Sequence, residues 1–125
     1  MVGATIYKAV KKSKLFNIIS CNRKDLDLTN QKLVEKWFKK NKPEIVINAA
    51  GKVGGILDNS TYQSDYLYTN TMIGLNLINT SLKYEVKQFI NLGSACIYPK
   101  NVCQPIKEDS LLSSQLEKSN EGYAI

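Results

Sequence analysis

The chain has 125 residues, a length that allows one folded domain with a hydrophobic core but excludes most two-domain enzymes. Hydrophobic residues make up 43% and charged residues 22%, which is typical of a globular protein and argues against extended disorder. The formal net charge of +6 favours an anionic ligand such as a nucleotide, although a solvated, lysine-rich surface is the simpler explanation. No nucleic-acid-binding motif accompanies the charge, so we predict no nucleic-acid partner.

The composition also bears on location and chemistry. No apolar stretch approaches the roughly 18 to 20 residues that cross a bilayer, and the N-terminus lacks the apolar region of a signal peptide, so we predict no membrane association. The three cysteines are odd in number and lack the C-x-x-C spacing of a zinc site, which predicts reduced thiols, no metal site and a cytoplasmic protein. There is no histidine, the commonest general base.

Helices and strands are predicted to alternate along the chain. The helices show apolar residues three or four positions apart, as at Ile6 and Val10, whereas the strands are short apolar runs. The predicted elements, in chain order, are a helix over 4–14, a strand over 15–20, a helix that begins after Thr29 or Asn30 and ends at Asn41-Lys42-Pro43, a strand over 44–50, a helix over 61–84 and a strand over 87–93. The tail over 99–121 is polar and predicts a loop with one short helix near Leu111, and the segment around Gly54, Gly55 and Asn59 predicts another loop.

This order predicts a doubly wound α/β fold, Rossmann-like, with a parallel sheet. The run 44–50 is apolar throughout, as expected for a strand covered on both faces. No repeat or linker indicates a second domain, so we predict a partial NAD(P)-binding domain over 1–125. The strand that should precede the first helix is missing, and Gly3 stands where the last glycine of the phosphate-binding turn would lie.

The stretch NLGSACIYP, at the end of the last predicted strand, places a hydroxyl and a thiol two residues apart, at Ser94 and Cys96. Ligands bind at the carboxyl ends of the strands in an open parallel sheet, so both side chains are candidate site residues. Their position alone leaves a simpler alternative open, in which Ser94 ends a strand and Cys96 is a small buried apolar residue.

Three motifs in order carry a family resemblance: AAGKVGGI at 49–56, GSACIYP at 93–99 and NEGYAI at 120–125. They resemble the extended short-chain dehydrogenase/reductases, and among these the GDP-L-fucose synthases, along essentially the whole chain. The resemblance implies an NADPH-dependent enzyme that epimerises C3 and C5 of GDP-4-keto-6-deoxy-D-mannose and then reduces its C4 ketone. The cysteine of S-x-C-I-Y-P is fairly specific, because most relatives in the superfamily lack it.

The resemblance also implies a role for individual residues. Ser94 would polarise the C4 carbonyl, Tyr123 would protonate its oxygen, and Cys96 would be the base that removes the C3 and C5 hydrogens. Lys52, Ser94 and Cys96 would contact the substrate. The residues implied to bind NADP(H) are Gly3, Arg23, Asp27, Leu28, Ala49, Ala50, Gly51, Asn70 and Tyr123.

Several of these residues have simpler explanations, which the sequence leaves open. Arg23 suits the 2′-phosphate of NADP but can equally be an exposed surface arginine. Asp27 can cap the following helix. Lys52 can be a solvated lysine, and Asn70 can belong to a polar helix face.

The chain departs from the family pattern near its ends. The lysine of Y-x-x-x-K would lie two residues beyond Ile125, the first two glycines of the phosphate loop would precede Met1, and the family's histidine acid and C-terminal substrate domain are absent. We therefore expect a truncated piece of a longer, homodimeric enzyme, inactive by itself. Three alternatives remain open, in this order: another sugar-nucleotide epimerase or dehydratase of the same superfamily, a non-catalytic NADP-binding or interaction domain, and a lysine-rich nucleic-acid binder.

Overall fold

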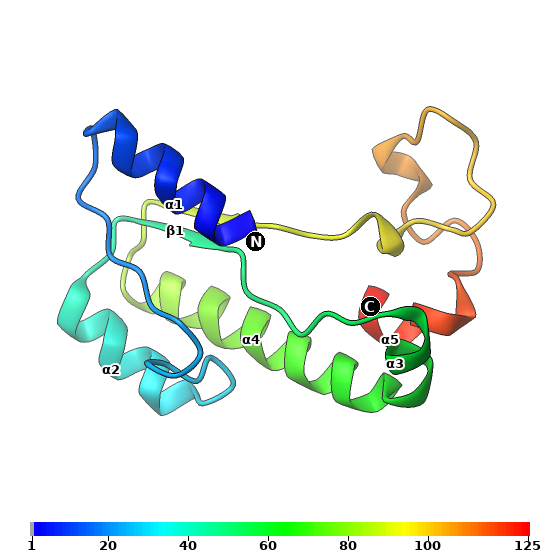
Figure 1. Cartoon of the computed structure of the whole chain (residues 1–125), viewed down its shortest axis with the longest axis horizontal. Coiled ribbons are helices and arrows are strands. Elements are labelled where there is room, and N and C mark those ends of the chain that lie inside the picture. Colours follow the sequence, from blue (N-terminus) through cyan, green and yellow to red (C-terminus); the bar gives the residue numbers. More distant parts are fainter. Residues whose placement is uncertain (1) are drawn as a thin grey trace. The chain divides into compact units, whose positions relative to one another are not determined.

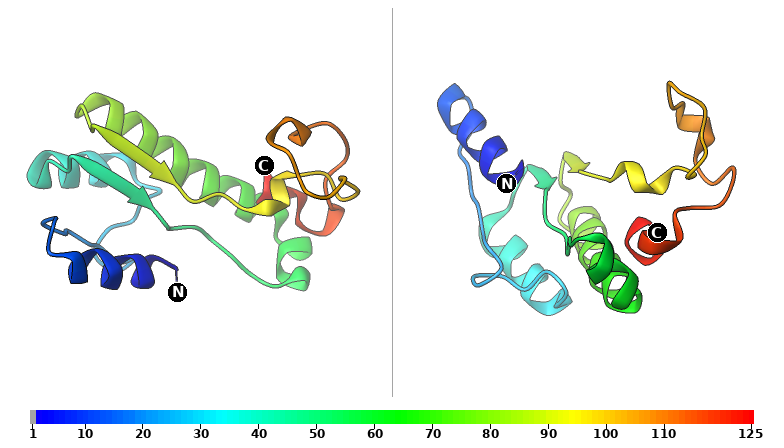
Figure 2. Two further views of the ribbon diagram at one scale, coloured as in Figure 1. Left: turned by 90° about the horizontal axis from the view of Figure 1, so that it is seen from above. Right: turned by 45° about the vertical axis from the view of Figure 1, so that its right-hand side comes forward.

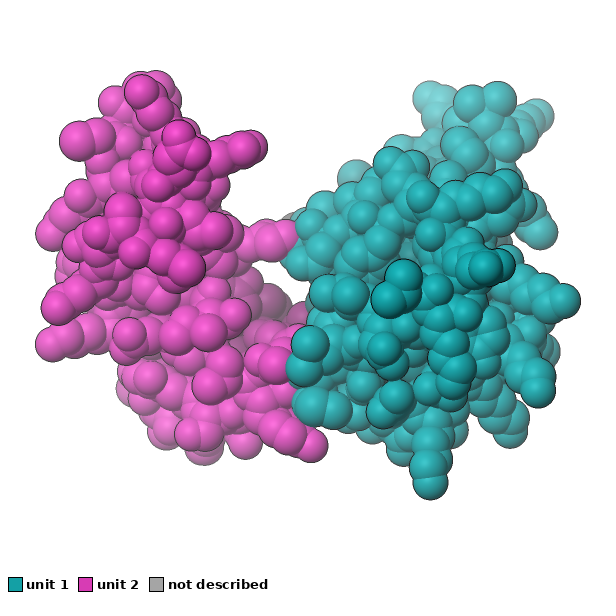
Figure 3. All heavy atoms as spheres, turned by 180° about the vertical axis from the view of Figure 1, so that it is seen from behind, with its two compact units in different colours: residues 1–50, 72–92 teal, residues 51–71, 93–125 magenta. Residues whose placement is uncertain are grey.

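A computed structural model describes residues 2–125 (Figure 1). The chain divides into two compact units, which Figure 3 colours separately. Unit 1 contains Met1–Ala50 and Met72–Leu92, and unit 2 contains Gly51–Thr71 and Gly93–Ile125. Among the helices described, none combines the length and the apolar character needed to cross a membrane.

Unit 1 is built around a two-stranded parallel sheet. Strand β1 (Ile45–Asn48) pairs with strand β2 (Gln88–Asn91), and Val46 lies opposite Phe89. The two strands run side by side in Figures 1 and 2. Helix α4 (Gln63–Lys83) lies between them in the sequence, because parallel neighbours need a long crossover connection. The predicted strands over 44–50 and 87–93 are thereby confirmed.

Helix α2 (Gln31–Asn41) begins and ends where the sequence indicated. The Asn30 side chain accepts a hydrogen bond at 3.2 Å from a backbone N–H of the first turn, so Asn30 rather than Thr29 is the N-cap. At the other end Lys42 takes a left-handed conformation with φ 45°, and its N–H bonds back to the last turn at 2.8 Å. Pro43 follows and cannot continue a helix.

The core of unit 1 lies between α2, the second part of α4 and one face of the sheet. Its buried apolar residues come from the two helices: Val34, Phe38, Ile73 and Leu77. Val46 and Phe89, partners across the sheet, pack against this cluster. Burial of each large apolar side chain contributes roughly 1.5–3 kcal/mol, so this face of the sheet is the main source of stability in unit 1.

The opposite face of the sheet is less covered than the sequence predicted. Ile45 and Ile47 are each 40% exposed. Helix α1 (Val2–Ser13), which corresponds to the predicted helix over 4–14, has no buried residue. The expectation that both faces of the strand over 44–50 are covered is therefore wrong for the described residues, because α1 places no side chain deeply enough to cover them.

The predicted strand over 15–20 is also wrong. Residues 14–22 form an irregular connection between α1 and α2, in which Leu15 is 79% and Phe16 56% exposed. An apolar run becomes a strand only when a neighbour accepts its backbone hydrogen bonds. Within the described part of the chain, β1 and β2 pair only with each other, so this segment has no strand to join.

An amide pair closes the carboxyl end of the sheet. The buried Asn48 donates from Nδ2 to Asn91 Oδ1 at 2.7 Å, and its Oδ1 accepts from the Ala50 N–H at 3.1 Å. The Leu92 N–H donates to the Asn48 carbonyl oxygen at 3.0 Å. Both strands are therefore tied together at the point where the chain leaves the sheet.

Unit 2 contains short helices that the sequence only partly predicted. Helix α3 (Ile56–Thr61) replaces the loop expected around Asn59, and α4 begins after an interruption at Tyr62. The remaining short helices are η1 (Ala95–Ile97), η2 (Glu108–Ser110), η3 (Lys118–Asn120) and α5 (Glu121–Ala124). Of these, η2 is the short helix expected near Leu111.

Candidate active site

Ser94 and Cys96 lie on one turn that follows β2. Ser94 is the N-cap of η1, and its Oγ accepts a hydrogen bond from the Cys96 N–H at 3.2 Å. A hydroxyl oxygen that accepts this bond still has its own hydrogen to donate. The turn therefore fixes the orientation of Ser94 and leaves its O–H able to donate to a carbonyl oxygen of a ligand.

Tyr123 lies on α5, which packs against η1 and η3 within unit 2 (Figure 2). Its ring meets the Tyr66 ring edge-on, with centroids 6.2 Å apart and planes at 84°. Nearby, Gln63 Nε2 donates to the Lys118 carbonyl oxygen at 3.2 Å, which ties the start of α4 to the turn before α5. The helix that carries Tyr123 is thus held against the turn that carries Cys96.

Asn120 contacts the thiol directly. Its Nδ2 donates to Cys96 Sγ at 3.3 Å from the position immediately before α5. Sulfur accepts such bonds weakly as a thiol and more strongly as an anionic thiolate. This contact joins the reactive sulfur to the helix that carries Tyr123.

Tyr66 is fully buried and supports two of the candidate residues. Its hydroxyl donates to the Asp58 carboxylate, and this hydrogen bond, together with burial, raises the pKa of Tyr66 to about 12. Lys52 Nζ lies 4.8 Å from the centre of the Tyr66 ring and pairs with Asp65 at 3.2 Å. The Tyr66 ring therefore contacts Lys52 through its face, and Tyr123 in an edge-on arrangement.

Two asparagines hold the loop that carries Lys52. The Asn70 Oδ1 accepts from the Lys52 N–H at 2.7 Å, and the Asn70 Nδ2 donates to the Lys52 carbonyl oxygen at 3.1 Å. Asn59 Nδ2 donates to the Gly54 carbonyl oxygen at 3.1 Å. A Cβ on Gly54 would overlap the Tyr66 hydroxyl, so the close approach of this loop to α4 requires glycine here. The amide oxygen and the amide nitrogen of Asn70 therefore both hold the backbone of Lys52 in place.

The ionisation of Tyr66 makes stability depend on pH. Tyrosine in the unfolded chain has a pKa near 10, whereas the pKa of Tyr66 in the folded protein is raised to about 12. The stabilising contribution of the protonated hydroxyl is therefore present below about pH 10 and is lost as the pH rises to about 12. We expect the free energy of unfolding, measured in urea, to fall more steeply across this range in the wild type than in Tyr66→Phe.

The exposed Tyr62 provides the matched control for this prediction, since Tyr62→Phe removes a hydroxyl from a side chain that is 53% exposed. Its unfolding free energy should follow the pH dependence of the wild type. If the free energy of unfolding falls equally steeply with pH in Tyr66→Phe and in the wild type, the prediction is contradicted.

Gly3, Ala49 and Ala50, which the sequence implied to line the cofactor, lie in unit 1. A Cβ on Gly3 would lie 3.4 Å from the Ala49 Cβ, so the first turn of α1 approaches the carboxyl end of β1 closely. A helix N-terminus beside the end of a parallel strand is the arrangement that binds the phosphates of a dinucleotide. The local geometry of these residues therefore fits such a cofactor.

Arg23, Asp27 and Leu28 lie in the connection before α2. The Asp27 carboxylate accepts bonds from the Thr29 N–H at 2.9 Å and the Thr29 hydroxyl at 2.7 Å, and these bonds lower the pKa of Asp27. Asp27 therefore shapes the turn before α2 and does not cap the helix. The Leu28 carbonyl oxygen accepts from Asn76 Nδ2 at 2.9 Å, and Arg23 is exposed.

The whole chain, residues 1–125, matches the model of the NAD dependent epimerase/dehydratase family. The chain belongs to this family. The match confirms the Rossmann-like α/β class that the sequence predicted, and it agrees with the parallel pairing of β1 and β2.

Individual relatives in the epimerase/dehydratase family are similar over the full chain. The chain is 46% identical to GDP-L-fucose synthase of Sinorhizobium fredii and 43% identical to GDP-L-fucose synthase 1 of Arabidopsis thaliana, over all 125 residues. It spans 40% and 39% of their respective lengths. The chain also matches the solved structure of MlghC, a GDP-mannoheptose C4 reductase from Campylobacter jejuni with NADP bound. The TM-score is 0.92 at 33% identity, and the match covers 98% of this chain and 36% of the MlghC chain. These findings confirm the resemblance to the GDP-L-fucose synthases.

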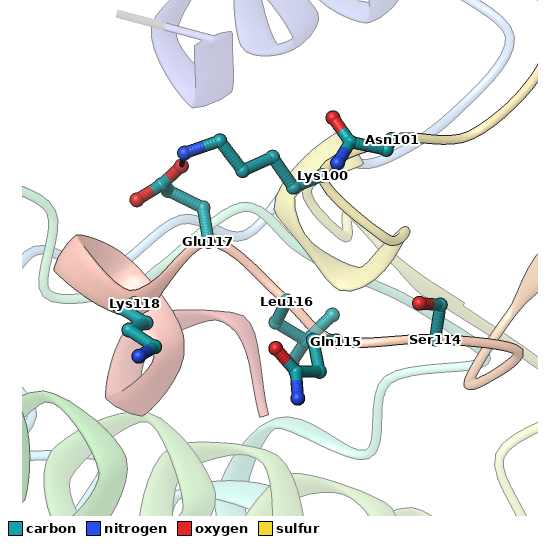
Figure 4. A pocket seen from close by; sticks show the side chains of 7 residues that line it. All are labelled: Lys100, Asn101, Ser114, Gln115, Leu116, Glu117 and Lys118. Carbon is teal, nitrogen blue, oxygen red and sulfur yellow. Dashed lines mark ion pairs between the residues drawn. The ribbon is translucent and has the colours of Figure 1, made fainter.

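A pocket of about 310 Å³ also lies in unit 2, lined by Lys100, Asn101 and residues 114–118. Lys100 Nζ points to the Glu117 carboxylate and pairs with it at 2.6 Å, as Figure 4 shows. The hydrogen bond from Lys100 lowers the pKa of Glu117. None of the residues predicted for the site lines this pocket, in which Lys100 and Glu117 pair with each other and Lys118 adds a further positive charge.

The residues predicted from the sequence fall into both units. Those in unit 2 are Gly51, Lys52, Asn70, Ser94, Cys96 and Tyr123, and those in unit 1 are Gly3, Arg23, Asp27, Leu28, Ala49 and Ala50. The sequence did not single out Tyr66, Gly54 or Asn59 as supports of the site, nor Asn120 as a partner of the thiol. Asn120 shows why the sequence could not reveal them, because its partner, Cys96, lies 24 residues earlier in the chain and only tertiary packing brings the two together.

Proposed function

We propose that the natural protein that carries this chain converts GDP-4-keto-6-deoxy-D-mannose to GDP-L-fucose with NADPH, and that this chain contributes Ser94, Cys96 and Tyr123 to catalysis. The observation that carries the proposal is the Ser94–Cys96 turn, hydrogen-bonded within itself and packed against the helix of Tyr123. The similarity to two GDP-L-fucose synthases supports it. Residues 1–125 would then be part of the NAD(P)-binding domain of a cytoplasmic homodimer.

Cys96 is the proposed base of the epimerisation. The hydrogens on C3 and C5 flank the C4 ketone, so loss of either one as a proton leaves an enolate with its charge on the C4 oxygen. A thiolate at Cys96 accepts that proton, and the Ser94 O–H donates to the developing oxyanion. Return of a proton from an acid or water to the opposite face of the carbon inverts its configuration.

Tyr123 is the proposed proton donor of the reduction. NADPH, when bound, supplies the hydride for C4. The Tyr123 phenol then gives its proton to the C4 oxygen, while Ser94 keeps its hydrogen bond to the same oxygen. The edge-on packing against the buried Tyr66, which is itself anchored to Asp58, holds the phenol ring in place.

The proposed cofactor-binding residues of unit 1 lie at the first turn of α1, at the end of β1 and in the connection before α2. Gly3 allows the first turn of α1 to approach Ala49, where phosphates would bind, and small residues at 49–51 leave room for the cofactor beside the strand. Arg23 is proposed to meet the 2′-phosphate of NADP, which an acidic residue would reject. The NADP bound in the structure of MlghC supports this choice of cofactor.

Lys52 is proposed to meet the phosphates of the nucleotide sugar. Its backbone is fixed by Asn70, and its ammonium group pairs with Asp65, whose side chain is 68% exposed. Exposed ion pairs of this kind contribute little, roughly 0–1 kcal/mol, so the ammonium group can change partner when a phosphate arrives.

The direct test is turnover of GDP-4-keto-6-deoxy-D-mannose by the purified natural protein. We expect one NADPH to be oxidised for each GDP-L-fucose formed, with the configuration of C3, C4 and C5 read by NMR. The 125 residues expressed alone should show no turnover. A reduced product with unchanged C3 and C5 would contradict the epimerase half of the proposal and indicate a C4 reductase instead, and no NADPH oxidation would contradict the proposal as a whole.

A further inference from the structure

Asn120 stands at the N-terminal end of α5, where an asparagine side chain commonly accepts a hydrogen bond from the backbone of the first turn. The Asn120 side chain makes no such bond. Its Nδ2 instead donates to Cys96 Sγ at 3.3 Å. The side chain is therefore directed to the thiol and away from the local contact that its position offers.

The other end of the same amide gives a second, independent observation. Asn120 Oδ1 is buried and has no hydrogen-bond partner within the described residues. A buried amide oxygen without a partner lowers stability, so such groups are rare and call for an explanation. Departures of this kind from local rules concentrate at functional sites. The unpaired Oδ1 is explained if the role of Asn120 is to direct its Nδ2 N–H to the Cys96 sulfur.

We infer that Asn120 is a positioning residue for Cys96, which it orients and whose thiolate form it stabilises. An N–H donor bonds more strongly to an anionic sulfur than to a neutral thiol, so the contact favours the deprotonated state. Asn120 acts through Cys96 and needs no contact with the substrate. The inference rests on the proposed function only where it takes Cys96 to be the epimerisation base.

The contacts around Cys96 show how the positioning works. The Cys96 N–H is held by Ser94 Oγ, which fixes the backbone, and Cys96 Sγ is held by Asn120, which fixes the side chain. Asn120 directly precedes α5, the short helix that carries Tyr123. The base and the proposed proton donor are therefore held by a common element.

The test is the pH dependence of Cys96 alkylation by iodoacetamide in the natural protein, followed by mass spectrometry of the Cys96 peptide. Only the thiolate reacts, so the rate reports its population. Asn120→Leu removes the donor at similar size, and we expect the midpoint of the profile to move to higher pH and the rate near pH 7 to fall about tenfold. Asn120→Asp, which places a carboxylate beside the sulfur, should move the midpoint further in the same direction.

Asn101→Leu is the matched control, since Asn101 is an exposed asparagine of the same unit, and its profile should be that of the wild type. A wild-type midpoint in Asn120→Leu would overturn the inference, whatever Asn120→Asp shows, because the added carboxylate shifts the midpoint by itself. If Asn120→Leu fails to fold, Asn120→Ala decides in its place, because it also removes the donor and adds no charge beside the sulfur.

Alkylation also separates this inference from the proposed function, because it requires no turnover. A shifted alkylation profile in a protein that does not turn over the GDP-sugar would support the coupling of Asn120 to the thiol while contradicting the assignment of Cys96 as the epimerisation base. Turnover without any shift would support the function and overturn the role of Asn120.

Discussion

Under the proposed function, replacement of Cys96 by serine in the natural protein should slow the exchange of the C3 and C5 hydrogens of GDP-4-keto-6-deoxy-D-mannose with D₂O by about 10²- to 10⁴-fold, the usual contribution of a general base. Serine has nearly the same size, but its hydroxyl holds its proton far more tightly than a thiol and is a poor base without a partner. The exchange is followed by NMR in the absence of NADPH. Loss of exchange therefore reports on proton removal and is independent of the reduction.

Cys21 and Cys103 provide the controls, because both are exposed free thiols. Cys21→Ser and Cys103→Ser should exchange the C3 and C5 hydrogens at the wild-type rate. Wild-type exchange in Cys96→Ser, or its loss in either control, would assign the base to another residue.

Substitution of Gly54 by alanine should lower the free energy of unfolding by about 1–3 kcal/mol, the range observed when extra atoms are forced into a packed site. The added Cβ would overlap the Tyr66 hydroxyl and lie 2.6 Å from the Asp58 carboxylate. Either the loop or the buried tyrosine has to move, and the hydrogen bond between Tyr66 and Asp58 is weakened. Urea denaturation at neutral pH measures the loss.

Gly55 is the matched control, because a Cβ there meets no atom within 4 Å. Gly55→Ala should leave the free energy of unfolding nearly unchanged, and comparable losses in the two variants would contradict the steric argument. Since the Tyr66 ring also contacts Lys52 and Tyr123, Gly54→Ala should lower the turnover of the natural protein more than Gly55→Ala does.

The parts of the fold that depend on local chemistry could be predicted from the sequence. Asn30 caps α2 and Lys42 ends it through interactions within a few residues, so the local sequence determines where this helix begins and ends. The strand over 15–20 could not be judged in this way. Its apolar residues permit a strand, but whether one forms depends on a partner strand elsewhere, which no feature of the segment itself reveals.

The candidate site likewise combines residues that the local sequence indicates with residues whose role depends on tertiary packing. Ser94 and Cys96 follow a strand and carry recognisable chemistry, which makes them candidates, but only the family resemblance assigns them a role over the simpler structural explanation. Their supports come from other segments, since Asn120 reaches the thiol and Asp58 anchors Tyr66 only through tertiary packing. Asn70 was selected as a cofactor-binding residue, yet its bonds to the Lys52 backbone depend on how the loop meets the helix, which no spacing rule describes.

The bridge between Asn48 and Asn91 has a consequence for the segments that follow the two strands. Both segments that carry candidate catalytic or substrate residues leave the sheet just beyond these two side chains, whose bond of 2.7 Å keeps the strand ends together. Changes of length or sequence further along either segment leave the departure points unaltered. We therefore expect substitutions and insertions in these segments to leave the register of β1 and β2 unchanged.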